Sequence, residues 1–186
     1  MAVSISPEKF TLVQFDRDEL HQVLQKLIAA VGLPADIDVE VNVDETTPLG
    51  RASITSYDPV VIALESGALE DPKKPRQLSP SGAADVLGRL LLRVSDRRDP
   101  AFGEPPPDDE LPLRQSVAWD VYSIGRLVGL GYKHYDNRQR RLYHFRNRHG
   151  FTDAADEAFD RLWTSEGLSW SDIASLSDNA AAVAGV

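Results

Sequence analysis

The stretch IDVEVNVD at residues 37–44 decides the fold of this chain. Apolar Ile37, Val39, Val41 and Val43 alternate strictly with polar residues, and a period of two places alternate side chains on opposite faces of a β-strand. One face is then buried and the other faces solvent. The sequence therefore predicts a strand in a sheet that is covered on one face.

Upstream of this strand, residues 16–31 predict an amphipathic α-helix. Asp16 precedes Glu19 by three residues, which is the spacing of a capping box, and Gly32 with Pro34 marks the end of the helix. Apolar residues recur at helical spacing between these signals, at Leu20, Val23, Leu24, Leu27, Ile28 and Val31.

Downstream, residues 52–56 predict a weaker strand, and the apolar run at 59–64 predicts a strand covered on both faces. Residues 71–77 are polar and predict a loop. Ser79 and Pro80 begin a second helix that reaches residue 94. Residues 99–112 are acidic and rich in proline, so we expect an exposed, irregular loop.

The last third of the chain predicts helices only. One spans 114–130, another begins at 152 or 153, and a short one spans 169–176. Gly125 and Gly129 lower the helix propensity of the first, so we expect a neighbouring backbone to approach them closely. We interpret Trp119, Trp163 and Trp170 as core anchors.

These elements indicate the α+β class, with a three-stranded antiparallel or mixed sheet and four to five helices mainly on one face. We expect one domain over 1–176 and a flexible, alanine-rich tail over 177–186. In outline, the order helix, strands, helix resembles zincin-like metallopeptidases. The helix that would bind their zinc reads ADVLGRLLLRV at 84–94 and lacks histidine and glutamate, and HExxH is absent, so the resemblance implies a form without the catalytic metal.

Composition excludes several classes of protein. The chain has no cysteine, which excludes disulfides and thiolate chemistry, and it has no apolar run of the ~20 residues that a membrane helix needs. Its N-terminus does not resemble a signal peptide. We therefore expect a cytoplasmic protein that does not enter the membrane. A net charge of −9 disfavours a nucleic-acid-coating protein.

Residues 133–149 are the most unusual segment. They carry six Lys or Arg residues against one Asp, a local charge of +5 that leaves −14 on the rest of the chain. Arginine forks bind carboxylates and phosphates, and aromatic rings stack on flat ligands. The residues we expect to contact an anionic ligand or an acidic protein are Arg138, Arg140, Arg141, Tyr143, His144, Arg146, Arg148 and His149.

If this segment is extended, even-numbered side chains from Leu142 to Arg148 share one side, and Tyr143, Phe145 and His149 share the other. For the arginines themselves, pairing with acidic residues within the fold or across a dimer is favoured over ligand binding, because acidic residues are frequent nearby. They include Asp108, Asp109, Glu110, Asp153, Asp156, Glu157 and Asp160.

Catalytic and metal-binding hypotheses have weaker support. His134, Asp136, His144 and His149 lack the usual ligand spacing, so we expect no metal and no cofactor. A hydrolase-like site would combine His144 and His149 with Asp153.

DNA reading has little support either. Residues 167–177 resemble the first helix of a helix-turn-helix, but no lysine or arginine follows Arg161 to read DNA. The favoured hypothesis is a non-enzymatic binding module. A small hydrolase and a homo-oligomeric assembly subunit, with its arginines paired to acidic loops, are the alternatives.

Overall fold

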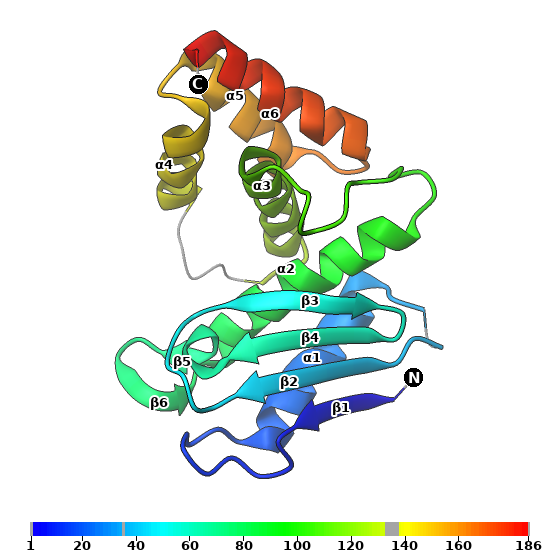
Figure 1. Ribbon diagram of the computed structural model, residues 1–186, viewed down its shortest axis with the longest axis vertical. Helices are drawn as coiled ribbons and strands as arrows, with labels where there is room; N and C mark the ends of the chain where they lie inside the picture. The colour runs from blue at the N-terminus through cyan, green and yellow to red at the C-terminus, as the bar shows by residue number, and fades with distance from the viewer. Residues whose placement is uncertain (1, 35, 133–137, 186) are drawn as a thin grey trace. The chain divides into compact units, whose positions relative to one another are not determined.

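The alternating segment becomes β2 (Val39–Asp44), an inner strand of a mixed four-stranded sheet. The computed structural model describes residues 2–34, 36–132 and 138–185 of the chain (Figure 1). The strand order is β1-β2-β4-β3, in which β1 (Val3–Ser6), β2 and β4 (Val60–Glu65) are parallel. The remaining strand, β3 (Ala52–Tyr57), pairs antiparallel with β4. The predicted α+β class is confirmed, with a sheet of the mixed kind.

Strand β2 buries one face, as its alternation predicts. Val39, Val41 and Val43 are buried, whereas Glu40 and Asp44 are exposed. Removing each valine from water contributes roughly 1.5 kcal/mol or more, so this strand is a substantial part of the core.

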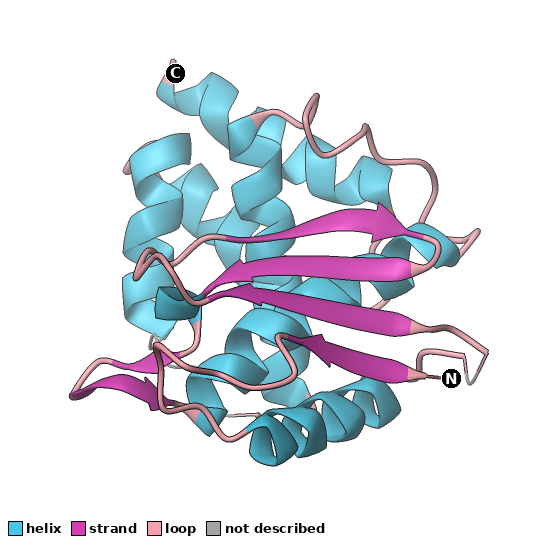
Figure 2. Cartoon of the chain, turned by 60° about the horizontal axis from the view of Figure 1, so that its bottom comes forward, coloured by secondary structure: helices cyan, strands magenta, loops and turns pink. Residues whose placement is uncertain are grey.

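Helix α1 (Arg17–Val31) connects β1 to β2 and begins and ends where the sequence predicts. The Asp16 carboxylate accepts hydrogen bonds from the backbone N–H groups of Asp18 and Glu19, at 2.9 and 3.2 Å. Gly32 ends the helix with a φ of 74°, which glycine adopts without a Cβ clash. The helix lies behind the sheet in Figure 1 and below it in Figure 2, so it covers one face.

Strand β4 departs in part from its prediction. Val60, Ile62 and Leu64 are buried, but Val61 and Ala63 on the other face are only half-buried. A continuous apolar run therefore marks a strand with one well-covered face here, because β4 belongs to a sheet whose second face is partly open.

Two strand regions escape the sequence prediction. Strand β1 is only four residues long, and β5 (Glu70–Asp71) with β6 (Lys74–Leu78) forms a hairpin where a loop is predicted. The hairpin follows a short 3-10 helix, Ser66–Ala68. Its stability comes from hydrogen bonds rather than an apolar pattern, since the Glu70 carboxylate accepts from the Arg76 backbone N–H at 2.9 Å.

Helix α2 (Pro80–Arg98) begins at the predicted residue and extends four residues beyond the predicted end. The Ser79 hydroxyl accepts a hydrogen bond from the Gly82 backbone N–H at 3.1 Å. Within this helix the chain divides into two compact units, Met1–Ser95 and Asp96–Val186, a division that composition does not indicate. We call them the sheet unit and the helical unit.

The helical unit contains the end of α2 and four further helices. These are α3 (Leu113–Gly129), α4 (Arg138–His149), α5 (Asp153–Thr164) and α6 (Trp170–Ala184). Thr152 and Ser169 cap α5 and α6 through their side chains.

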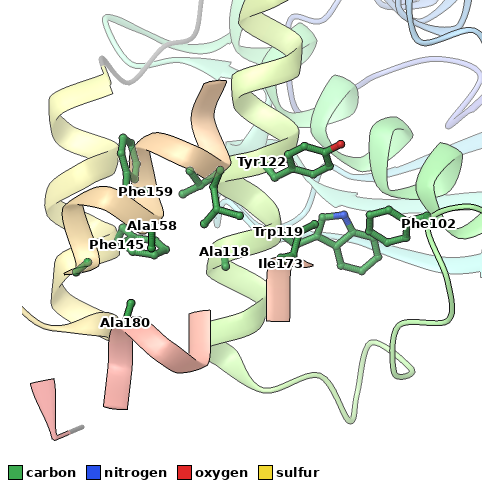
Figure 3. Close-up of a cluster of buried hydrophobic side chains, with 12 residues drawn as sticks. Phe102, Ala118, Trp119, Tyr122, Phe145, Ala158, Phe159, Ile173 and Ala180 are labelled. Carbon is green, nitrogen blue, oxygen red and sulfur yellow. The ribbon is translucent and has the colours of Figure 1, made fainter. Parts of the chain in front are cut away.

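Aromatic rings dominate the core of the helical unit (Figure 3). Phe102 stacks on Trp119 with ring centroids 5.4 Å apart, and Phe145 meets the edge of Phe159 at 5.8 Å. Each aromatic side chain buries more apolar area than an aliphatic one, so a small number of residues supplies much of the buried area of this unit.

A buried carboxylate joins this core. Asp96 accepts a hydrogen bond from the Trp119 indole N–H at 2.7 Å and two from the Arg126 guanidinium at 2.8 and 2.6 Å. The Arg126 guanidinium also lies 4.1 Å from the centroid of the Tyr122 ring. The two charges are therefore paired inside the unit, although the buried Arg126 Nε has no hydrogen-bond partner among the described residues.

The acidic loop at 99–112 has no helix or strand, as predicted, yet it is attached to the helical unit. Arg97 donates hydrogen bonds to the carbonyls of Pro105 and Pro106, at 3.2 and 2.7 Å, and to the Asp108 carboxylate at 2.6 Å. The Phe102 carbonyl accepts a bond from the Trp170 backbone N–H at 2.7 Å.

The predicted tail region is helical up to Ala184. Ala180 and Ala181 are buried because their small side chains let α6 pack closely. Small size also matters at Gly125, where an added Cβ would lie 2.2 Å from the Trp163 carbonyl oxygen. Gly129 has no such neighbour within 4 Å, so the predicted close approach occurs at one glycine only.

Candidate functional site

The basic segment forms helix α4 over its described part, Arg138–His149. The alternating sides that an extended segment would have are therefore wrong, because a helix places residues three and four apart on one face. The described residues do not include Lys133, His134 or Asp136. The structure therefore does not test a metal site that uses His134 or Asp136.

One face of α4 packs into the core of the helical unit. Phe145 and His149 are buried, and Leu142 is half-buried. The rings of Phe145 and His149 stack with centroids 3.8 Å apart and an angle of 8° between their planes. A helix with five arginines is thus anchored by one stripe of three side chains.

His149 is part of this anchor, although the sequence predicts it as a contact residue. Its Nδ1 lies 3.1 Å from the Phe145 carbonyl oxygen and its Nε2 lies 2.8 Å from Ser177 Oγ. Since a carbonyl only accepts, Nδ1 carries the proton and the Ser177 hydroxyl donates to Nε2. Burial lowers the pKa of His149, and the nearby Arg114 lowers it further, against opposing effects of the Phe145 carbonyl and Asp178.

A second face of α4 is neutralised by α5. Arg138 forms an ion pair with Asp160, and Arg146 forms a two-pronged ion pair with Asp156, of which the Nε–Oδ1 contact is 2.6 Å. The Arg146 guanidinium holds the pKa of the Asp156 carboxyl below its usual range. The predicted internal pairing is therefore confirmed for these two arginines.

Beside this face lies an exposed pair of rings. Tyr143 is 56% exposed and Phe151 is 63% exposed, and they meet edge to face at 5.8 Å. The Arg146 guanidinium lies 6.0 Å from the Phe151 ring centroid. Arg146 is thus engaged by both a carboxylate and a ring.

The third face of α4 forms one wall of a groove, and α3 forms the other. The groove has a volume of about 480 Å³. From α4 come Arg141, His144, Asn147 and Arg148, and from α3 come Leu113, Val117, Asp120 and Val121.

The two walls of this groove differ in character. Arg141, His144 and Arg148 recur at spacings of three and four, and the two arginines make the α4 wall basic. On the α3 wall, Leu113 is exposed, Val117 is half-buried, and Val121 belongs to the buried core of the helical unit. The sequence identifies the α4 residues through their charge. It does not identify Val117 and Val121 as groove residues, because their helical spacing looks like that of ordinary core positions.

Arg140 is exposed on α4 and does not line the groove, but it has interactions elsewhere in the structure. The eight predicted contact residues therefore separate into three faces of one helix. Of the eight, Arg141, His144 and Arg148 line this groove together.

The hydrolase hypothesis requires His144, His149 and Asp153 in one cleft. His144 lines the groove, Asp153 is exposed in the first turn of α5, and His149 is packed inside the core. His149 and Ser177 make the contact of a catalytic dyad, but both side chains are fully buried, so a substrate cannot reach them. Among the described residues, no group of three or more His, Cys, Asp or Glu is placed to hold a metal ion.

A second hollow, of about 290 Å³, lies in the sheet unit. Its two carboxylates are already occupied by the chain itself. Glu45 accepts backbone N–H bonds from Thr11 and Leu12 at 2.8 and 2.6 Å, and these bonds lower its pKa. Glu70 binds the Arg76 backbone and the Ser66 hydroxyl. Glu45 therefore holds residues 11–13 in place, and Glu70 holds the hairpin of β5 and β6.

Comparisons with known proteins give no information about this site. No protein-family model, curated protein or solved structure matches the chain, and no relation to zincin-like metallopeptidases is found. Within the described ranges, no helix is both long enough and apolar enough to cross a lipid bilayer.

Proposed function

We propose that this chain is a non-enzymatic binding module that holds an acidic partner in the groove between α3 and α4. The observation that carries the proposal is exposed Arg148, which lines the groove beside His144 and opposite the exposed side chain of Leu113. Arg138 and Arg146 are paired with Asp160 and Asp156, and Arg141 also has an interaction within the chain, so Arg148 is the groove arginine on which the proposal depends.

The charge of the chain supports an acidic partner. Helix α4 holds five arginines and no acidic residue, a formal +5 against −14 on the rest of the chain, and two of the five are paired with carboxylates of α5. An acidic partner is repelled by most of the molecule and attracted at α4. Such a field favours correct orientation during encounter and weakens as salt is added.

The burial of His149 favours this proposal over the hydrolase alternative. The buried ring uses both nitrogens inside the core, with Phe145 and Ser177. Burial lowers its pKa, which favours the neutral form of the ring. A groove of arginines above apolar side chains supports recognition of carboxylates and offers no activated nucleophile.

The test is calorimetric titration with poly-L-glutamate, a flexible polyanion, at low and high sodium chloride. Arg148→Ala should weaken binding about fivefold, near the upper end expected for an exposed ion pair. The matched control is Arg161→Ala, which removes the same charge from an exposed position on α5 of the same unit. Equal losses for both variants, or no binding by the parent protein, would refute the groove as the binding site.

A further inference from the structure

Arg76, in the hairpin of β5 and β6, has a backbone conformation that glycine adopts more easily. Among the described residues it is the non-glycine residue with a positive φ, at 66°. In this left-handed region the Cβ crowds the following carbonyl oxygen, so an arginine here lowers stability. Two hydrogen bonds hold the conformation. The Arg76 N–H donates to the Glu70 carboxylate at 2.9 Å, and the Arg76 carbonyl accepts from the Gln14 N–H at 2.7 Å.

The Arg76 side chain makes no contact that would offset this strain. It is exposed, and within the described ranges its guanidinium has no hydrogen bond or ion pair. The same holds for Lys73 and Lys74, so three cations stand within four residues of the hairpin, which lies at one end of the sheet (Figure 1). The backbone N–H of Lys73 donates to the Asp71 carboxylate at 2.8 Å, so the turn is held as well. A fixed, unpaired guanidinium is suited to bind an anion from outside the chain.

Arg76 lines the hollow of about 290 Å³ in the sheet unit. Part of the lining is apolar and comes from Leu12, Val13, Pro48 and Pro75. Leu12 is 51% exposed, so it can be covered by a ligand. Glu45 and Glu70 also line the hollow, and their carboxylates would repel an anion that entered it. A ligand would therefore keep its anionic end on Arg76 and place a neutral part in the hollow, whose volume suits one small organic group.

We propose that Arg76, with Lys73 and Lys74, binds the phosphate of a small phosphomonoester whose apolar part rests on Leu12 and Pro75. At pH 7 a phosphomonoester carries a charge of about −1.5 to −2 and has three acceptor oxygens, so it can bind a guanidinium fork and ammonium groups together. A single carboxylate has less charge and fewer acceptors for the same three cations. This site goes beyond the proposed function, because it lies in the sheet unit and uses no residue of the groove.

The probes are phenyl phosphate, inorganic phosphate and benzoate, each titrated calorimetrically into the full chain. Phenyl phosphate should bind about tenfold more tightly than inorganic phosphate, which has no apolar part to cover Leu12. It should exceed benzoate by a similar factor, because benzoate has the same ring but a single charge. Absence of phenyl phosphate binding, or equal affinities for any two of these probes, would overturn the proposal.

Arg76→Gly separates the anion site from a structural role. It should weaken phenyl phosphate binding about tenfold, as expected for loss of a charged hydrogen-bonding group. Its melting temperature should stay unchanged or rise by up to about 4 °C, because glycine relieves the strain. Arg76→Asn should behave in the same way, since asparagine also tolerates this conformation. A lower melting temperature with unchanged affinity would assign the side chain a structural role and refute the site.

Two matched pairs locate the ligand. Leu12 and Leu49 are both 51% exposed, and of the two Leu12 lines the hollow. Leu12→Ser should therefore abolish the preference for phenyl phosphate over inorganic phosphate, whereas Leu49→Ser should keep it. Lys74→Ala should weaken both phosphates, and Lys26→Ala, which removes an exposed cation from α1 of the same unit, should weaken neither. Equal effects within either pair would contradict the site.

The groove variant distinguishes this proposal from the proposed function. Arg148→Ala should leave phenyl phosphate binding unchanged, because Arg148 belongs to the helical unit. If Arg148→Ala abolishes this binding and Arg76→Gly does not, the phosphate binds in the groove and the hairpin site is refuted. The titration with poly-L-glutamate still decides the proposed function in that case.

Discussion

The sheet of the sheet unit and the core of the helical unit are stabilised by different kinds of contact. The buried strand residues are all aliphatic, as at Val41 and Ile62. The helical core instead joins aromatic rings to buried polar pairs, Trp119 with Asp96 and His149 with Ser177. An aliphatic core tolerates small changes of shape, whereas a buried polar pair fails when either partner is lost. We therefore expect the helical unit to be the more sensitive to single substitutions.

The largest effect should come from Gly125→Ala. Its new methyl group would lie 2.2 Å from the Trp163 carbonyl oxygen, a backbone atom that cannot move without separating α3 from α5. We expect a loss of at least about 3 kcal/mol in the free energy of unfolding, or failure to fold. Chemical denaturation followed by circular dichroism measures it.

Gly129→Ala is the internal control, since it makes the same change in the same helix with no atom within 4 Å of the new Cβ. It should be neutral or stabilise by up to about 1 kcal/mol. Equal destabilisation by both variants would show that the close approach of α3 and α5 does not govern the response at Gly125.

Asp96→Asn should follow in size, at about 2–3 kcal/mol, because it leaves the Arg126 guanidinium without a charged partner and weakens the acceptor for Trp119. The matched change Asp160→Asn breaks the exposed pair with Arg138 and should cost less than about 1 kcal/mol. Comparable losses in the two denaturation curves would contradict the importance given to burial.

A pH-dependent loss should come next. Because the pKa of His149 is lowered in the folded state, the unfolded chain binds a proton more readily. Its stabilisation is complete above the unfolded pKa of about 6.5 and declines below it, by at most about 1.4 kcal/mol per pH unit. Carboxylates that titrate near pH 4 contribute little between pH 6.5 and 5.5.

His149→Gln should remove this slope while changing the overall stability. The charged groups near His149 are Arg114 and Asp178, and the latter accepts from the Gln115 amide at 3.1 Å. Denaturation at several pH values gives the slope of each protein. A slope that persists unchanged in the variant would assign the effect to other residues.

The smallest effect should be that of Ile62→Val, which removes one methyl group from the buried face of β4. Its expected cost is about 1 kcal/mol, in the range for such deletions. A cost as large as that of Asp96→Asn would contradict the comparison between an adaptable aliphatic sheet and a demanding polar core.

The same contrast explains what the sequence reveals. The alternation at 37–44 and the caps at Asp16 and Gly32 are local patterns, so β2 and α1 are predicted almost to the residue. Strand β1 is too short for a periodic signal. Polar β6 takes its shape from hydrogen bonds to Glu70, a residue outside the strand.

The candidate groove is only half predictable, for a related reason. Charge alone identifies Arg141, His144 and Arg148. Which face of α4 each occupies depends on the buried anchor of Phe145 and His149, and that anchor requires Ser177, 28 residues further along the chain. A pairing between residues so far apart in the sequence leaves no periodic pattern. The sequence therefore does not predict which face of α4 lies against α3.

The aromatic core has one more consequence, which is optical. All three tryptophans of the chain, Trp119, Trp163 and Trp170, belong to the helical unit, and residues 1–95 contain none. Tryptophan fluorescence, excited selectively, therefore reports on the helical unit alone, because the sheet unit has no tryptophan to emit. Comparing a melt followed by this emission with one followed by total heat absorption measures how strongly the two units unfold together, without any added label.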